Sequence, residues 1–158
     1  MPAAAFALQA GAGDGTLVVQ NGTAPRGVAV VTLVISGAAI GQIEGFGKIV
    51  IEDPTPNDGA PPEVTGADWN RQSGDTYTYG GSGPGFRFRA VGGTYKITLY
   101  GTGVDLVAGG RGSVVLTGST DVPQHDGLYS LNGAEFHSLP ATSTKQLQIS
   151  LPTSATTQ

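Results

Sequence analysis

The chain has 158 residues, no cysteine and only 13% charged residues, against 26 glycines and 10 prolines. This composition disfavours a helical protein, because glycine and proline interrupt helix interiors and few charged side chains remain to cover helix surfaces. The length suits a single β domain, residues 1–158, whose core needs neither a disulfide nor a structural metal.

The charge balance argues against a nucleic-acid partner. Twelve acidic residues outnumber eight basic ones and give a net charge of -4, whereas nucleic-acid binders are usually attracted to phosphates by an excess of positive charge. The absence of cysteine also excludes a thiolate metal site and a cysteine nucleophile. We therefore expect no cofactor and no nucleic acid.

The N-terminal sequence MPAAAFALQAGAG lacks the basic start of a signal peptide, and its apolar stretch is short. The longest apolar run, residues 28–35, cannot span a bilayer. The default expectation is a soluble cytoplasmic protein without membrane insertion; a mature secreted form would have the same appearance.

The predicted strands of the first half begin with residues 17–20. Residues 28–36 are apolar on both faces and are expected at the centre of a sheet, followed by a crossover over residues 39–43 and an alternating strand over residues 48–52. A loop rich in proline and aspartate follows over residues 53–62. Residues 76–79 continue the β pattern, and residues 80–85 read as a hinge-like connector.

The clearest strands lie within residues 85–118. Two runs rich in aromatic and β-branched residues flank Gly92-Gly93, the signal of a tight hairpin turn. Counting outward from that turn places Ala90 opposite Tyr95, Phe88 opposite Ile97 and Phe86 opposite Leu99 on a core face. Arg89 would then face Lys96, and Arg87 would face Thr98, on a wet face.

The pattern of the first half recurs in the second. The string Gly45-Phe-Gly-Lys-Ile-Val-Ile51 matches Gly110-Arg-Gly-Ser-Val-Val-Leu116, and four further segments match in the same order. We expect an internal repeat of residues 15–79, a connector of residues 80–85 and a second repeat of residues 86–151. Two repeats are too few for a free-standing solenoid, so they should face each other about a pseudo-twofold axis. The predicted fold is all-β, a β-sandwich or closed barrel of about ten short strands.

The strings GTGVDLVAGGRGSVVLTG and GLYSLNGAEFHSLP resemble those of a group of glycine-rich bacterial β proteins of no known activity. The resemblance covers roughly residues 86–140 and, more loosely, residues 15–53. It implies an all-β fold and brings no catalytic residue or cofactor.

Candidate chemistry is sparse. Glu135 and His137 share one face of a predicted strand, with Phe136 opposite, which is ordinary strand alternation rather than a complete catalytic site. Oxygen ligands of the kind that calcium uses occur in two loops, but the same residues also favour turns; they are Asp53, Asn57, Asp58, Asp121 and Asp126. The glycine strings join strand to strand, so they lack the helix that a phosphate-binding loop requires.

The sharpest surface feature is a predicted basic patch of Arg87, Arg89, Lys96 and Tyr100 on the wet face. It would suit an anionic ligand, an acidic sugar or the acidic face of another subunit. An acidic residue on a neighbouring strand, or solvent alone, would also compensate its charge. Trp69 and Phe136, which are equivalent in the two repeats, are expected as core plugs rather than as platforms for sugars.

The leading hypothesis is a non-enzymatic structural or protein-interaction domain that self-associates or joins a larger assembly. The alternative is a binding module for a carbohydrate or a small anionic ligand.

Overall fold

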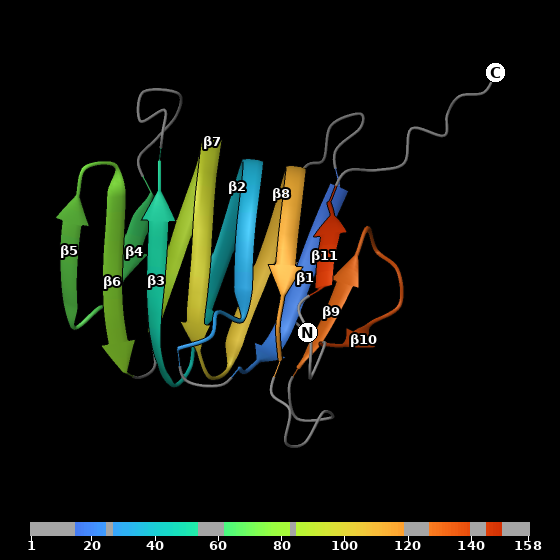
Figure 1. Ribbon diagram of the computed structural model, residues 1–158, viewed down its shortest axis with the longest axis horizontal. Helices are drawn as coiled ribbons and strands as arrows, with labels where there is room; N and C mark the ends of the chain where they lie inside the picture. The colour runs from blue at the N-terminus through green and yellow to red at the C-terminus, as the bar shows by residue number, and fades with distance from the viewer. Residues whose placement is uncertain are drawn as a thin grey trace.

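A computed structural model describes residues 15–24, 27–53, 62–82, 85–118, 127–139 and 145–149. Within these ranges the chain forms strands and turns and no helix, and all strand pairs are antiparallel (Figure 1). The strands are β1 (Gly15–Gly22), β2 (Val31–Ile43), β3 (Phe46–Glu52), β4 (Glu63–Thr65), β5 (Trp69–Ser73), β6 (Thr76–Ser82), β7 (Phe86–Gly101), β8 (Val104–Leu116), β9 (Leu128–Leu131), β10 (His137–Ser138) and β11 (Lys145–Gln148).

The described strands form a single sheet of eleven strands in the order β10-β9-β1-β8-β2-β7-β3-β6-β5, with β11 paired to β8 and β4 paired to β7. The two end strands of this path, β10 and β5, do not pair with each other in the described part of the chain, so the sheet is not closed. The all-β prediction is confirmed. β2 lies between β7 and β8, as its two-sided apolar pattern predicts.

The three long strands β2, β7 and β8 can each be divided into two portions, because β7 and β8 each exchange one neighbour part-way along while β2 lies between them throughout. We call the first set the β1 half-sheet: β10, β9, β1, residues 104–110, residues 38–43, residues 86–91 and β4. The second set is the β3 half-sheet: β11, residues 111–116, residues 31–36, residues 94–101, β3, β6 and β5. In Figure 1 the two portions of the long strands lie one behind the other.

A row of glycines crosses the sheet where β7 and β8 change neighbours. Gly93 of β7, Gly37 of β2, Gly110 of β8 and Gly15 of β1 are successive register partners. Gly37 has φ +154° and Gly110 has φ +142°, values that residues with a side chain rarely adopt. A Cβ at either position would also overlap a carbonyl oxygen of the neighbouring strand. The strands can therefore bend and pack closely there only because these residues lack a side chain.

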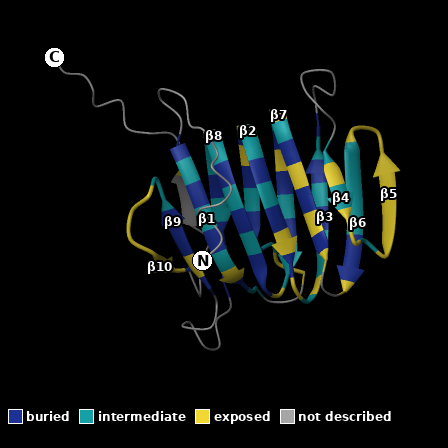
Figure 2. Cartoon of the chain, turned by 180° about the vertical axis from the view of Figure 1, so that it is seen from behind, coloured by how far each residue is buried: buried dark blue, intermediate teal, exposed yellow. Residues whose placement is uncertain are grey.

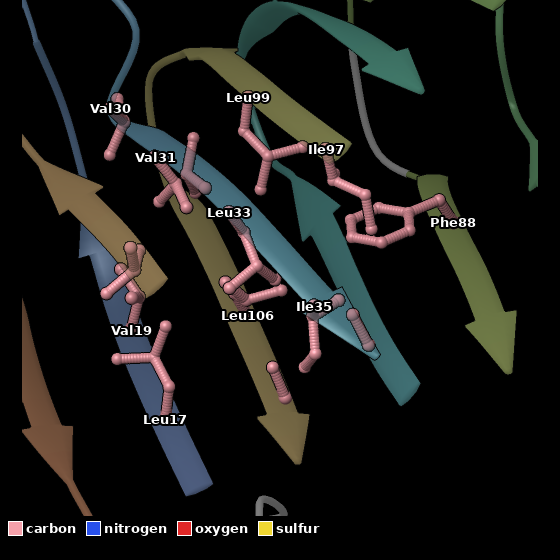
Figure 3. Close-up of a cluster of buried hydrophobic side chains, with 14 of the residues drawn as sticks. Leu17, Val19, Val30, Val31, Leu33, Ile35, Phe88, Ile97, Leu99 and Leu106 are labelled. Atoms are coloured by element: carbon pink, nitrogen blue, oxygen red, sulfur yellow. The ribbon is translucent and has the colours of Figure 1, made fainter. Parts of the chain in front are cut away.

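The core lies on one face of both half-sheets. Residues alternate between buried and accessible along each long strand, and the buried ones from β1, β2, β7 and β8 form one cluster (Figures 2 and 3). Phe86, Phe88 and Ala90 contribute from one portion of β7, and Ile97 and Leu99 from the other. Because side chains alternate between the two faces of a strand, each half-sheet has one apolar face toward the core and one face that points away from it.

The predicted hairpin at Gly92-Gly93 is wrong. Residues 86–101 form the single strand β7, which pairs with β2 along its length, so Phe88 lies opposite Gly41 and Ile97 opposite Leu33. Gly92 is the unpaired residue of a β-bulge, and the Tyr95 hydroxyl donates a hydrogen bond to the Val91 carbonyl (3.0 Å) across it. A glycine pair permits either a turn or a bulge, and here the distant strand β2 supplies the hydrogen-bond partners that a hairpin would have supplied.

Two further boundaries differ from the prediction. Residues 39–43 continue β2 rather than crossing over, because β7 and β8 pair with them on both sides. Gly80 and Gly81 belong to β6 and are buried, so the predicted connector is partly strand. Trp69 and Phe86 lie over these two glycines, in the space that a side chain would fill.

Candidate functional site

The structure does not bring the four residues of the predicted basic patch together. Arg87 and Arg89 lie in residues 86–91 of β7, whereas Lys96 and Tyr100 lie beyond the bulge in residues 94–101. The predicted facing pairs required a hairpin, but the two runs are consecutive portions of one strand. The patch is therefore two separate places on two half-sheets.

Lys96 and Tyr100 both have partners on β3. The Lys96 ammonium forms a salt bridge with the Glu52 carboxylate at 3.8 Å, and the Lys48 ammonium lies 4.5 Å from the centre of the Tyr100 ring. An acidic residue on a neighbouring strand thus compensates Lys96. Because both Lys96 and Glu52 are well exposed, the pair contributes little to stability.

Arg87 and Arg89 lie on the outer face of the β1 half-sheet, opposite the core. The register places Arg87 between Thr65 of β4 and Gln42 of β2, and Asp105 of β8 follows Gln42 in the same row. In the next row Arg89 lies between Glu63 and Ile40, and Val107 and Val18 follow. We call this surface the Arg87 face and define it by Arg87, Arg89, Gln42, Ile40, Asp105, Val107 and Val18.

Hydrogen bonds fix the acidic group of the Arg87 face. The Asn21 backbone N–H donates to Asp105 Oδ1 at 2.8 Å, and Gln42 Nε2 donates to Asp105 Oδ2 at 3.3 Å. Arg87 is exposed and forms no ion pair within the described ranges. One row therefore carries an oriented carboxylate and an unpaired guanidinium on the two sides of β2.

The next row of the Arg87 face is apolar. Ile40, Val107 and Val18 are direct neighbours on β2, β8 and β1, and each is only partly buried although it points away from the core. Outward positions of a sheet that faces water are usually polar. In the sequence, the sign of this row is that apolar residues occupy the outward-facing positions of these strands as well as the inward-facing ones.

A second candidate site is a hollow of about 360 Å³ beside the ends of β3 and β7. Its lining includes Val28, Phe46, Lys48 and Tyr100, and the Phe46 side chain is 77% exposed. The Lys48 contact with Tyr100 places a cation beside an aromatic ring here. The sequence indicated Tyr100 but not Phe46 or Lys48.

The predicted core plugs are exposed instead, which corrects that prediction. Trp69 is 47% and Phe136 44% exposed. Trp69 lies on the end strand β5, all five residues of which are exposed (Figure 2), and its ring lies 5.9 Å from the Arg71 guanidinium.

On β6, which pairs with β5, burial raises the pKa of the Tyr79 hydroxyl, and the charge of Tyr77 adds to this shift.

The residues considered for catalysis and metal binding do not form a described site. His137 lies opposite Tyr129, with the ring centres 5.8 Å apart, and both Glu135 and His137 are exposed. Asp53 is buried at the end of β3, whereas Asn57, Asp58, Asp121 and Asp126 lie outside the described residues. Within the described ranges no group of three His, Cys, Asp or Glu side chains is placed to hold a metal ion.

No family model, curated protein or solved structure matches the chain. The described residues contain no helix of the length and apolarity needed to cross a membrane.

Proposed function

We propose that the protein is a non-enzymatic structural domain that self-associates through the Arg87 face. The observation that carries this proposal is the outward apolar row of Ile40, Val107 and Val18 on three adjacent strands. A contiguous apolar surface with a polar rim is typical of a protein-contact site. Here Arg89 and Glu63 flank the row on one side.

The first test compares two valines of β8. Val107→Lys places a charge in the apolar row, whereas Val115→Lys makes the same change at an outward, partly buried position of the β3 half-sheet. We expect wild type and Val115→Lys to form the same oligomer in light scattering after size exclusion, and Val107→Lys to be monomeric. A monomeric wild type over the whole concentration series would contradict the proposal.

Carbohydrate binding at the Phe46 hollow is the second candidate function. Its support is the exposed Phe46 ring beside Tyr100 and Lys48. Aromatic rings present a flat apolar surface on which a sugar can stack, and a lysine favours a sugar that carries a carboxylate.

A glycan array followed by calorimetry tests this candidate. If the hollow binds a uronic-acid glycan, Phe46→Ala should weaken binding at least about tenfold, equivalent to ~1.4 kcal/mol. Trp69→Ala is the matched control, because Trp69 is also exposed but lies outside the hollow. Equal losses in both variants, or no glycan bound by wild type, would contradict sugar binding at this site.

We also infer that the two half-sheets pack as a β-sandwich made of the two internal repeats. The order of strands supports this, because, apart from the end strands β10 and β5, each half-sheet has corresponding strands at equal distances from its centre when the two repeats are exchanged. In the β1 half-sheet, β1 lies between β9 and residues 104–110, and residues 86–91 lie between β4 and residues 38–43. Leu17 opposite Ala108 then corresponds to Phe86 opposite Ile43. The boundaries 15–79 and 86–151 stay predictions.

A further inference from the structure

The geometry points to a specific partner for the Arg87 face: a second copy of this chain, related by a twofold axis that lies between the two copies, over residues 38–43 of β2 and parallel to them. This inference rests on the proposed function and adds the arrangement of the two copies. It follows from how charge is distributed on the two sides of β2.

The row that contains Gln42 is complementary to itself. Arg87 lies one strand to one side of Gln42, and Asp105 lies one strand to the other side. Strands are about 4.8 Å apart, so the positions of Arg87 and Asp105 are about 10 Å apart within one copy. A twofold rotation about an axis over β2 and parallel to it exchanges the two sides. It sets Arg87 of each copy against Asp105 of the other, so the pair forms at two symmetric places.

The same rotation matches the apolar row. Ile40, which lies in β2 directly below the axis, meets the partner's Ile40, and the aliphatic stem of Arg89 covers the partner's Val107. Two sheets can pack face to face in this way, with their strands nearly aligned and about 10 Å apart.

Self-complementarity distinguishes a second copy from an unrelated partner. In a twofold interface the same patch lies on both sides, so each positive group needs a negative group at the mirrored position of its own surface. The Arg87 face meets this requirement, since Asp105 is held in place by the Asn21 N–H and by Gln42. A purely basic or purely apolar patch would not meet it.

A charge-reversal series tests the pairing. Arg87→Asp and Asp105→Arg each set like charges against each other at two symmetric places, and we expect either variant to weaken the dimer at least about 100-fold in sedimentation equilibrium. The double variant Arg87→Asp/Asp105→Arg restores opposite charges and should recover the dimer. Arg71→Asp on β5 is the control and should leave dimerisation unchanged, because Arg71 lies on the β3 half-sheet.

A cross-linking experiment tests the axis itself. Because the chain has no cysteine, Gln42→Cys introduces a single thiol, which the proposed axis places opposite its own copy. Facing sheets are too far apart for a disulfide, so a short bis-maleimide is the reagent. We expect a covalent dimer from Gln42→Cys and none from the control Asn70→Cys on exposed β5.

The outcomes separate this inference from the proposed function. The inference alone is overturned if the wild type is a dimer and both single charge-reversal variants, shown by their melting temperatures to be folded, dimerise as tightly as the wild type. Two further results together would also overturn it: the double variant fails to recover the dimer, and Gln42→Cys gives no covalent dimer. A wild type that is monomeric throughout overturns both.

Discussion

Gly37→Ala should destabilise the protein by about 3 kcal/mol or more, since it adds a strained backbone conformation to a steric overlap. Gly37 has φ +154°, and its Cβ would overlap the carbonyl oxygen of Gly109 on β8. That oxygen belongs to the backbone of a central strand, so it cannot move without disturbing the pairing of β2 with β8. Chemical denaturation and thermal melting of wild type and variant measure the loss, which corresponds to a fall in melting temperature on the order of 10 °C.

Gly74→Ala is the matched control. Gly74 also has a positive φ, +61°, but no atom lies close to the position of its Cβ. The substitution should cost only about 1 kcal/mol, the penalty of a left-handed conformation for alanine. If the two variants lost equal stability, the close packing at the glycine row would not be what Gly37 provides.

Phe88→Ala should cost about 3 to 5 kcal/mol, the range for removing a fully buried ring. Phe88 is 2% exposed and packs over Gly41, where an added Cβ would lie 2.6 Å from the ring. The ring thus fills the space that the glycine leaves, and its removal creates a cavity in the cluster that joins both half-sheets (Figure 3). Urea denaturation should show a lower midpoint with an unchanged slope.

Phe46→Ala provides the comparison within the same protein. Its side chain is 77% exposed, so the change in unfolding free energy should stay within about 0.5 kcal/mol. A large loss in Phe46→Ala would show that Phe46 contributes to folding and would weaken its assignment to a binding hollow.

The inward and outward positions of residues 86–101 could be predicted from the sequence, but their partners could not. Phe86, Phe88, Ile97 and Leu99 are buried as the alternation predicts, because side-chain direction in a strand depends only on local geometry. The residues that pair with them across the sheet belong to β2, which lies far earlier in the chain than β7. The local glycine pair therefore suggested a turn where the fold has a bulge.

For the same reason, only part of the candidate site could be predicted from the sequence. Arg87 and Arg89 were recognised as exposed and basic. The placement of Arg87 and Asp105 in one row, on the two sides of Gln42, follows only because β2 lies between β7 and β8. No local spacing encodes that order. Trp69 was misplaced because an aromatic residue favours burial in general, whereas β5 is an end strand with all its residues exposed.

The position of β2 also constrains how the protein folds during synthesis. Both neighbours of β2 are made later, since β7 begins at Phe86 and β8 ends at Leu116. Until then the growing chain presents the apolar strand β2 with both of its hydrogen-bonding edges open. Folding through such distant contacts is slow, and open strand edges promote aggregation. The N-terminal half of the nascent chain therefore needs protection from other chains until the C-terminal half emerges.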